Sequence, residues 1–292
     1  MKKILYAVLA VTIVAGFAFM GCGKDDPTTA PPSGGTSTPA IAMISIPAGN
    51  FAMGSAVGDP GYTLDEDPQH TVYLDAYQIS KYEITNAQYK TFIDAGGYST
   101  EGYWTTDGWI WRTANSITMP LDWVDSTNNS WPDFPNYPVN GICWYEAYAF
   151  CKWAGGKLPT EAQWEKAARS VNATNYWPWG PVWDASKCNS TYNVSIDTFT
   201  ISSPVGYFGY GQSPYGVYDM AGNLWEMVGD WYQSDYYSTS PDSNPTGPVF
   251  ALTNRVIRGG SHGSVYNSCR CAERNTYAPT SRGYSVGFRL VK

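Results

Sequence analysis

The amino-acid sequence predicts an irregular α+β fold, in which short strands and a few short helices are joined by long packed loops. The chain of 292 residues holds 13 Trp and 23 Tyr beside 29 Gly and 20 Pro. So many aromatic side chains in a Gly- and Pro-rich chain suit short strands and packed loops better than a helical bundle. No low-complexity linker interrupts residues 41–292, so this region is expected to be one domain.

The N-terminus has the pattern of an export signal. Met1-Lys2-Lys3 precedes an apolar run that ends at Met20, and Gly21-Cys22 follows. We therefore expect a lipoprotein signal peptide at 1–21, with Cys22 as the lipidated first residue. The alternative is an ordinary secreted protein with a stray cysteine. Residues 22–40 are rich in Pro, Ser, Thr and Gly and predict a flexible tether.

Charge and composition exclude several classes of function. The net charge of -7 argues against nucleic-acid binding and against a basic membrane-binding face. The two histidines, His70 and His262, are too few for a histidine-rich zinc or iron site. Without Cys22, five cysteines remain, an odd number, so at least one thiol stays unpaired within the chain.

The sequence of the first half of the domain predicts strands followed by a helix. Residues 43–55 alternate apolar and small side chains and predict a strand and turn. Residues 70–97 begin with two strand-like runs and then change period. Thr85 and Gln88 form a capping box at the start of a helix, which Gly96-Gly97 should end.

A Trp-rich insert at 98–138 has no clear period, and two short helices are expected within 141–170. The first of them should end at Gly155-Gly156. The second opens at Thr160, with Gln163 closing a capping box. Cys151 shares a face with the apolar residues of the first helix and is expected to be buried rather than nucleophilic.

Six segments of the chain resemble, in order, the signature blocks of the formylglycine-generating, or sulfatase-modifying-factor, family. They span nearly all of residues 43–291 and are specific as a set. The resemblance implies the family's irregular α+β fold, which is related to C-type lectins and has little regular secondary structure. The segments are "IPAGNFAMGS", "YEITNAQYKTFI", "AYAFCKWAGGKLPTEAQWEKAAR", "YGVYDMAGNLWE", "RGGS" and "GFRLV".

The resemblance also implies two structural calcium sites, in stretches where side-chain oxygens and turn carbonyls suit a hard cation. From spacing alone, turns with Asx-type hydrogen bonds would account for both stretches. In the second site Asp219 stands where Asn is expected. The first site takes the side chains of Asn189 and Asp197 and the carbonyls of Ser190 and Phe199, and the second takes Asp219, Gly222, Leu224 and Glu226.

For an enzyme of this family, the resemblance implies oxidation of a substrate cysteine at a copper ion that is held by two cysteine thiolates. The first of these positions is Ser264 in this chain, and a hydroxyl is a poor ligand for Cu(I). Cys269 is the one weak catalytic candidate. Cys271 would share a face with it if this segment were a strand. We therefore expect no copper site and no oxidase.

Residues 262–286 are crowded with Tyr, Ser, Gly and Asn, a mixture typical of binding surfaces. The segment resembles the variable region of retroelement-diversified proteins, including surface lipoproteins with this domain. The alternative is the polar loop of a degenerate enzyme pocket. The resemblance places one set of side chains on an exposed surface that Trp225 supports: His262, Ser264, Tyr266, Asn267, Tyr277 and Tyr284.

The sequence thus predicts a non-catalytic binding protein, anchored to the bacterial cell envelope through lipid on Cys22 and exposed outside the cytoplasm. Its partner would be an unknown protein or surface ligand at residues 262–286, with calcium as a structural cofactor. Two alternatives stay open. One is a formylglycine-generating oxidase that uses copper and oxygen, and the other is a structural envelope component that assembles through the insert at 98–138.

Overall fold

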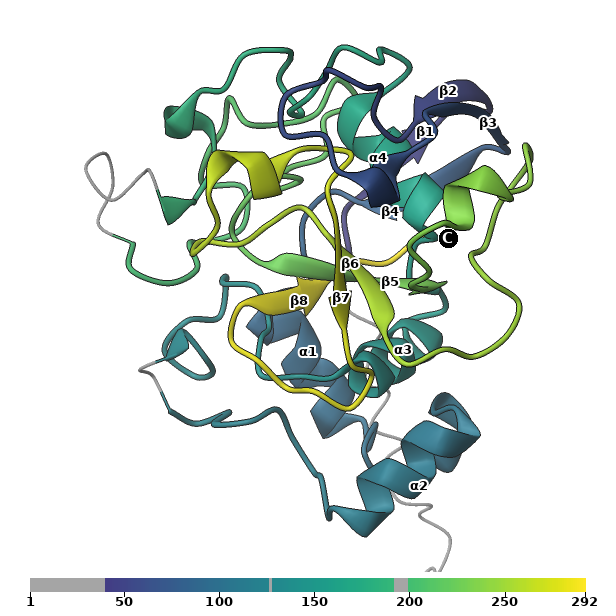
Figure 1. The fold of residues 1–292 in the computed structure, drawn as a ribbon. Coiled ribbons are helices and arrows are strands. Elements are labelled where there is room, and N and C mark those ends of the chain that lie inside the picture. Colours follow the sequence, from purple (N-terminus) through teal and green to yellow (C-terminus); the bar gives the residue numbers. More distant parts are fainter. Residues whose placement is uncertain (1–39, 126–127, 192–198) are drawn as a thin grey trace, which may run out of the picture. The chain divides into compact units, whose positions relative to one another are not determined.

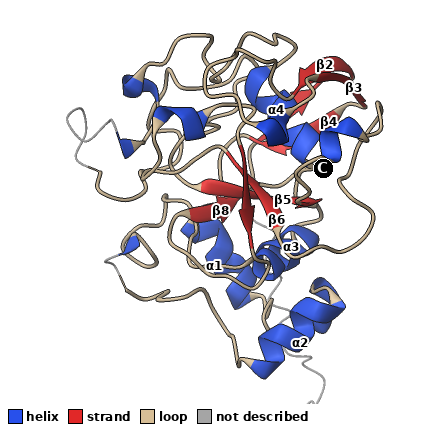
Figure 2. Cartoon of the chain, in the orientation of Figure 1, coloured by secondary structure: helices blue, strands red, loops and turns tan. Residues whose placement is uncertain are grey.

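Short helices and strands are separated by long loops (Figures 1 and 2). The structure is a computed structural model that describes residues 40–125, 128–191 and 199–292, all of which belong to one compact unit. The predicted signal peptide, Cys22 and the tether up to residue 39 lie outside the described residues. The prediction of an α+β fold with little regular secondary structure is confirmed.

The regular elements have the following bounds. The helices are α1 (Asn86–Asp94), α2 (Thr106–Ala114), α3 (Trp144–Trp153) and α4 (Glu161–Arg169). The strands are β1 (Met43–Ile46), β2 (Gly49–Met53), β3 (His70–Leu74), β4 (Tyr77–Ser80), β5 (Trp225–Trp231), β6 (Arg255–Arg258), β7 (Arg274–Tyr277) and β8 (Val286–Phe288). The 3-10 turns are η1 (Leu64–Glu66), η2 (Glu101–Tyr103), η4 (Ala185–Lys187), η6 (Tyr236–Ser238) and η7 (Tyr266–Cys269). Within the described ranges, no helix has the length and apolar character needed to cross a bilayer.

A four-stranded sheet with the order β7-β6-β5-β8 forms the centre of the domain. β5 and β7 are both antiparallel to β6, and β8 runs parallel to β5. β1 pairs with β4, and β2 pairs with β3. The single strand predicted at 43–55 is therefore two strands. The break falls where Pro47 has no N–H to donate and Gly49 has a φ of 136°, a value that side chains disfavour.

Two aromatic-rich cores lie on opposite faces of this sheet. α1 and α3 cover one face with side chains such as Phe92 and Phe150, and α4 with β1–β4 covers the other around Trp164 (Figure 1). Successive strand residues point to opposite faces. Met227 of β5 accordingly joins the first core and Val228 joins the second. β5 is covered on both faces, so even its two acidic residues, Glu226 and Asp230, are buried.

The predicted helix starts are confirmed, and one helix was missed. Thr85 and Thr160 both cap their helices through complete capping boxes, with Gln88 and Gln163 as the reciprocal partners. The insert at 98–138 contains α2, whose N-cap is Thr105. Its period is hidden in the sequence because Trp, Ile and Trp follow one another at 109–111, so the run shows no contrast between a polar and an apolar face.

Cys151 is 1% exposed within the first core, as expected. Cys269 and Cys271 were expected to share a face only if their segment were a strand, and this condition is not met, because Cys269 ends η7 and Cys271 follows it outside any strand. Cys269 therefore packs with Trp177, whereas Cys271 packs in the second core. The two thiols do not share a face.

Candidate functional site

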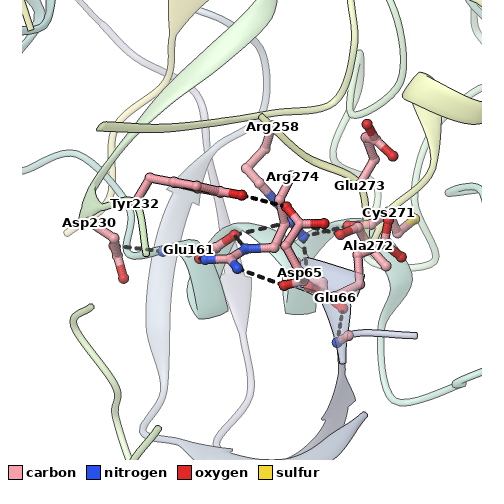
Figure 3. A network of polar contacts seen from close by, with 12 residues as sticks. Asp65, Glu66, Glu161, Asp230, Tyr232, Arg258, Cys271, Ala272, Glu273 and Arg274 are labelled. Atoms are coloured by element: carbon pink, nitrogen blue, oxygen red, sulfur yellow. Dashed lines mark hydrogen bonds and ion pairs between the residues drawn. The ribbon is translucent and has the colours of Figure 1, made fainter. Parts of the chain in front are cut away.

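A buried arginine lies at the end of β6, just before the segment 262–286 that is predicted to bind a ligand. Arg258 has no exposed side-chain surface, and its guanidinium lies 3.1 Å from Glu161 Oε1 and 2.6 Å from Glu165 Oε2. It also donates to the carbonyls of Cys271 and Ala272 at 2.7 and 2.9 Å (Figure 3). One side chain thus joins the end of β6 to helix α4 and to the far end of the loop that follows β6.

Two further arginines hold the other end of this loop. Arg270 grips Glu66 with two bonds of 2.6 and 2.8 Å and donates to the carbonyl of Gly61 at 2.7 Å. Arg274 binds both oxygens of Glu161 at 2.7 and 3.0 Å (Figure 3). Burial opposes ionisation of Glu161, but the adjacent guanidinium groups outweigh it and hold the pKa of this carboxyl below its usual range. The network therefore stays charged and fixed.

Between these anchors the chain turns sharply at Gly259-Gly260. Their φ angles are 93° and 75°. A Cβ added at Gly260 would lie 2.7 Å from the carbonyl oxygen of Ser268 and 2.9 Å from Cys269 Sγ. Both the conformation and the contact require glycine here. The turn brings the residues after it back against η7.

Tyr266 belongs to a cluster of aromatic side chains from two distant segments. Its ring centroid lies 6.4 Å from that of Trp177 and 6.2 Å from that of Trp183, and Trp183 is 5.6 Å from Trp179. Trp177 Nε1 also donates to the Tyr266 carbonyl at 3.0 Å. Tyr266 remains 38% exposed. We call Trp177, Trp179, Trp183 and Tyr266 the aromatic platform.

His262, Ser264 and Asn267 lie close to this platform in the chain. His262 donates its backbone N–H to the Asn223 carbonyl at 2.8 Å, and burial lowers the pKa of its imidazole. Ser264 Oγ accepts the backbone N–H of Ser261 at 2.9 Å. Asn267 packs closely beside Gly61: a Cβ added to that glycine would lie only 2.9 Å from Asn267 Oδ1.

The remaining predicted residues are Trp225, which begins β5, Tyr277, which ends β7, and Tyr284, which lies just before β8. Trp225 is 8% exposed, packs in the first core and donates its N–H to the Ser285 carbonyl at 2.9 Å. Tyr284 bonds Asp122 through its hydroxyl, which raises its pKa to about 12. Tyr277 is half-buried, and burial raises its pKa to about 12. The backbone from Asn223 to Trp225 connects this group to His262, and a single shared surface stays a prediction.

The thiols and the hydroxyl in this region do not fit the family's copper ion. Ser264 uses its hydroxyl oxygen to hold the backbone of its own turn. Cys269 has no exposed surface, and a hydrogen bond with Cys188, together with burial, raises the pKa of its thiol well above the usual value. A copper ion of this kind needs two soft thiolate ligands that an incoming substrate can reach. Ser264 and the buried Cys269 therefore do not fit such an ion.

At the first predicted calcium site, the structure describes Asn189 and Ser190, which are buried, and Phe199, which is partly exposed. The Asn189 side chain donates to the Ile201 carbonyl at 2.7 Å, and its own carbonyl accepts from Asn223 N at 2.8 Å. Ser190 is buried, and Phe199 packs edge-on against Tyr207 at 4.8 Å. Asp197 lies outside the described residues. Calcium at this site stays a prediction.

The second predicted site lies in a buried acidic region. Glu226 binds Arg289 through both oxygens at 2.5 and 2.7 Å, so this carboxylate already has a cationic partner. Asp219 accepts the N–H of Gly206 at 2.7 Å, and burial raises its pKa to about 6. Glu83 is fully buried nearby, so three carboxylates surround Arg289. Burial raises the pKa of Glu83 as well, and among the described residues no group of three or more His, Cys, Asp and Glu side chains is arranged to hold a metal ion. Calcium at this site stays a prediction.

Glu83 and the tryptophans of the platform are functional candidates that the sequence did not indicate. Glu83 accepts from Asn223 Nδ2 at 2.6 Å and from Leu224 N at 3.2 Å, and so holds the turn before β5. It follows Tyr82 in a strand-like run, and nothing local marks it as buried. The run "YWPWGPVW" at 176–183 is a visible aromatic cluster, but its proximity to Tyr266 depends on the fold.

Comparisons with known proteins agree with this architecture. The Streptomyces coelicolor formylglycine-generating enzyme is 32% identical, over 85% of this chain and 88% of its own. PvdO from Pseudomonas aeruginosa has a TM-score of 0.68 at 24% identity, covering 85% of this chain and 93% of its own. Treponema denticola variable protein 1 has a TM-score of 0.61 at 22% identity, covering 85% and 94%. These two structural likenesses concern the fold alone.

The six motif blocks lie in one continuous domain, and their glycine turns and capping boxes have the expected geometry. The match to the sulfatase-modifying factor enzyme 1-like domain family covers residues 29–292. The expected family resemblance is therefore confirmed, and this chain belongs to the sulfatase-modifying factor enzyme 1-like, or formylglycine-generating-enzyme-type, family.

Proposed function

We propose that this chain is an extracytoplasmic, lipid-anchored binding protein that presents residues 262–286 and the aromatic platform to a protein or surface ligand, without copper-dependent oxidation. The observation that carries the proposal is the state of Ser264. A hydroxyl occupies the expected position of the first copper-binding cysteine, and its oxygen accepts the backbone N–H of Ser261. This arrangement serves the shape of the loop rather than a reaction.

The platform supports a binding role. Tyr266 is partly exposed over Trp177 and Trp183, and its neighbour Val265 is 43% exposed. Rigid aromatic side chains provide contact area at a low cost in conformational entropy. The buried arginines fix both ends of the segment, so little ordering remains to be done when a ligand binds.

Calcium is proposed as a structural cofactor of the turns that lie beneath this surface. The concentration of Glu83, Asp219 and Glu226 around one arginine supports a cation near the second site. Asn189 and Asn223, which are bonded to each other through their backbones, connect the two predicted sites. Calcium here would stabilise the turns and take no part in recognition.

An oxidase is the second candidate function, because a formylglycine-generating enzyme is 32% identical over 85% of this chain. The test is to titrate the reduced full chain with Cu(I) against a chromophoric chelator, and then to incubate it with oxygen and a cysteine-containing sulfatase-type peptide. We expect no conversion of the peptide thiol to an aldehyde beyond that with copper alone. Conversion that is lost in Cys269→Ser would overturn the binding proposal.

Binding can be tested on an array of glycans and peptides. We expect captured signals to fall about tenfold or more for Tyr266→Ala and Trp183→Ala. Tyr210→Ala is the matched control, because Tyr210 is 87% exposed and lies outside the platform. If all three variants bind like the parent chain, the platform is not the binding surface.

A further inference from the structure

We propose that Cys188 and Cys269 are joined by a disulfide when the chain folds in an oxidising compartment, and that this bond connects the two segments of the aromatic platform. The cross-link does not depend on which ligand binds, but it rests on the proposed non-oxidase function, because a disulfide leaves Cys269 no thiolate for a metal. It would make the surface a covalently closed unit.

The two cysteines are partners in the fold. Cys188 and Cys269 are 2% and 0% exposed and lie together in a small cluster with Trp177 and Ala221. The two thiols are hydrogen-bonded to each other. On one side the approach is closed by Gly260, where an added Cβ would be 2.9 Å from Cys269 Sγ. The sulfur atom of Cys269 is thus confined next to its partner.

The other cysteines lie in different surroundings. Cys143 is at the N-cap of α3, where its backbone N–H donates to Glu146 at 2.9 Å. Cys151 packs in the first core, and Cys271 packs in the second. The sequence left the pairing open. The structure selects Cys188 and Cys269 as the pair that already faces one another.

The bond must form during folding by thiol–disulfide exchange, because both sulfur atoms are buried in the final structure. One cysteine thiolate attacks a sulfur of a small disulfide such as oxidised glutathione, and one glutathione thiolate leaves. The second cysteine thiolate then attacks the mixed disulfide and releases the other. Two protons pass from the cysteines to two glutathione thiols, and the oxidant gains the two electrons that the chain loses.

The cross-link would act on the platform directly. Cys188 closes the segment that carries Trp177, Trp179 and Trp183, and Cys269 closes η7, which begins at Tyr266. Thr191 N also donates to the Ser264 carbonyl at 3.1 Å, so the same two segments already meet through the backbone. A covalent bond would keep them together when the neighbouring loop opens.

Trypsin provides a direct test on the full chain folded with oxidised glutathione, alkylated and digested without reductant. Cleavage at Lys187, Arg255, Arg258, Arg270 and Arg274 places the two cysteines in the peptides 188–255 and 259–270, and places Cys271 in 271–274. We expect 188–255 linked to 259–270, and 271–274 alkylated. Alkylation of Cys188 and Cys269 in the oxidised chain, or a link of either to another cysteine, would overturn the proposal.

A stability measurement with matched variants gives the second readout. Reductant should lower the Tm of the parent chain by roughly 5–10 °C. This difference should vanish in Cys188→Ala and persist in Cys151→Ala, which removes an equally buried thiol from the first core. A reductant effect of the same size in both variants would show that the stabilising bond lies elsewhere.

Discussion

The buried arginine network should dominate the stability of the candidate site, and Arg258→Met tests this. The side chain of Arg258 makes two bonds to carboxylates and two to carbonyls, all away from water. Methionine fills a similar volume but leaves these acceptors without their donor. Removing one partner from a buried ion pair costs about 3–5 kcal/mol, because the remaining charge is uncompensated.

The structure places the expected cost at the lower part of this range. Glu161 keeps its two bonds to Arg274, and Glu165 keeps Arg169 at 3.1 Å, so neither carboxylate is left alone. We expect a loss of about 3–4 kcal/mol in the free energy of unfolding. In a domain of this size the loss would lower the Tm by roughly 10 °C.

Urea unfolding followed by tryptophan fluorescence measures the effect by linear extrapolation. Lys90→Met is the control, because Lys90 forms an exposed ion pair with Asp94 one turn away on α1. Its loss should cost less than about 0.5 kcal/mol. A cost below about 1 kcal/mol for Arg258→Met would refute the reasoning that this network holds the segment in place.

Three further predictions concern pH, backbone geometry and calcium. Burial and, after it, repulsion from Glu161 raise the pKa of Asp230 to about 7. The folded state therefore binds the carboxyl proton of Asp230 more tightly than the unfolded state does. The stability that this difference provides is lost as the pH rises from about 4 through 7. Asp230→Asn should flatten that fall by up to about 1.4 kcal/mol per pH unit in urea unfolding at stepped pH, and an unchanged slope would contradict the assignment. Gly260→Ala should lower the free energy of unfolding by more than about 1 kcal/mol, because Gly260 has a φ of 75° and an added Cβ would clash with the Ser268 carbonyl. Gly263→Ala is the control and should be nearly neutral, because an added Cβ there would be only in ordinary van der Waals contact, 4.0 Å from Ser261 Oγ. Equal losses in the two variants would contradict this account of the turn. Chelation should lower the Tm, and added calcium should restore it in a concentration-dependent way, so a Tm that ignores both treatments would end the calcium proposal.

Local signals in the sequence were sufficient for the helix ends and for single buried residues. Thr85 and Thr160 each carry their capping partner three residues on, so the sequence contains both halves of the interaction. The position of Cys151 followed from helical periodicity in the same way. These features depend on neighbours within one or two turns, which a sequence displays directly.

The arginine network could not be predicted in this way, because its partners are distant in the chain. Arg270 and Glu66 are 204 residues apart, and each has an ordinary polar context. Helix α4, "EAQWEKAAR", has the pattern of a charged surface helix, yet Glu161, Glu165 and Arg169 are buried. The fold surrounds the helix with arginines and carbonyls, and their ion pairs and hydrogen bonds offset the cost of removing its charges from water.

The ends and the tip of residues 258–274 are held in different ways, and this difference explains why such a segment suits a binding surface. Its two ends are held by the buried side chains of Arg258, Arg270 and Arg274. Its tip is held largely through the backbone, because His262 N donates to Asn223 and the Ser264 carbonyl accepts from Thr191. Main-chain bonds survive side-chain substitution. Changes at tip positions other than Ser264, whose hydroxyl accepts the Ser261 N–H, can therefore alter the exposed chemistry while the anchors keep the shape, which is the property that a displayed binding surface requires.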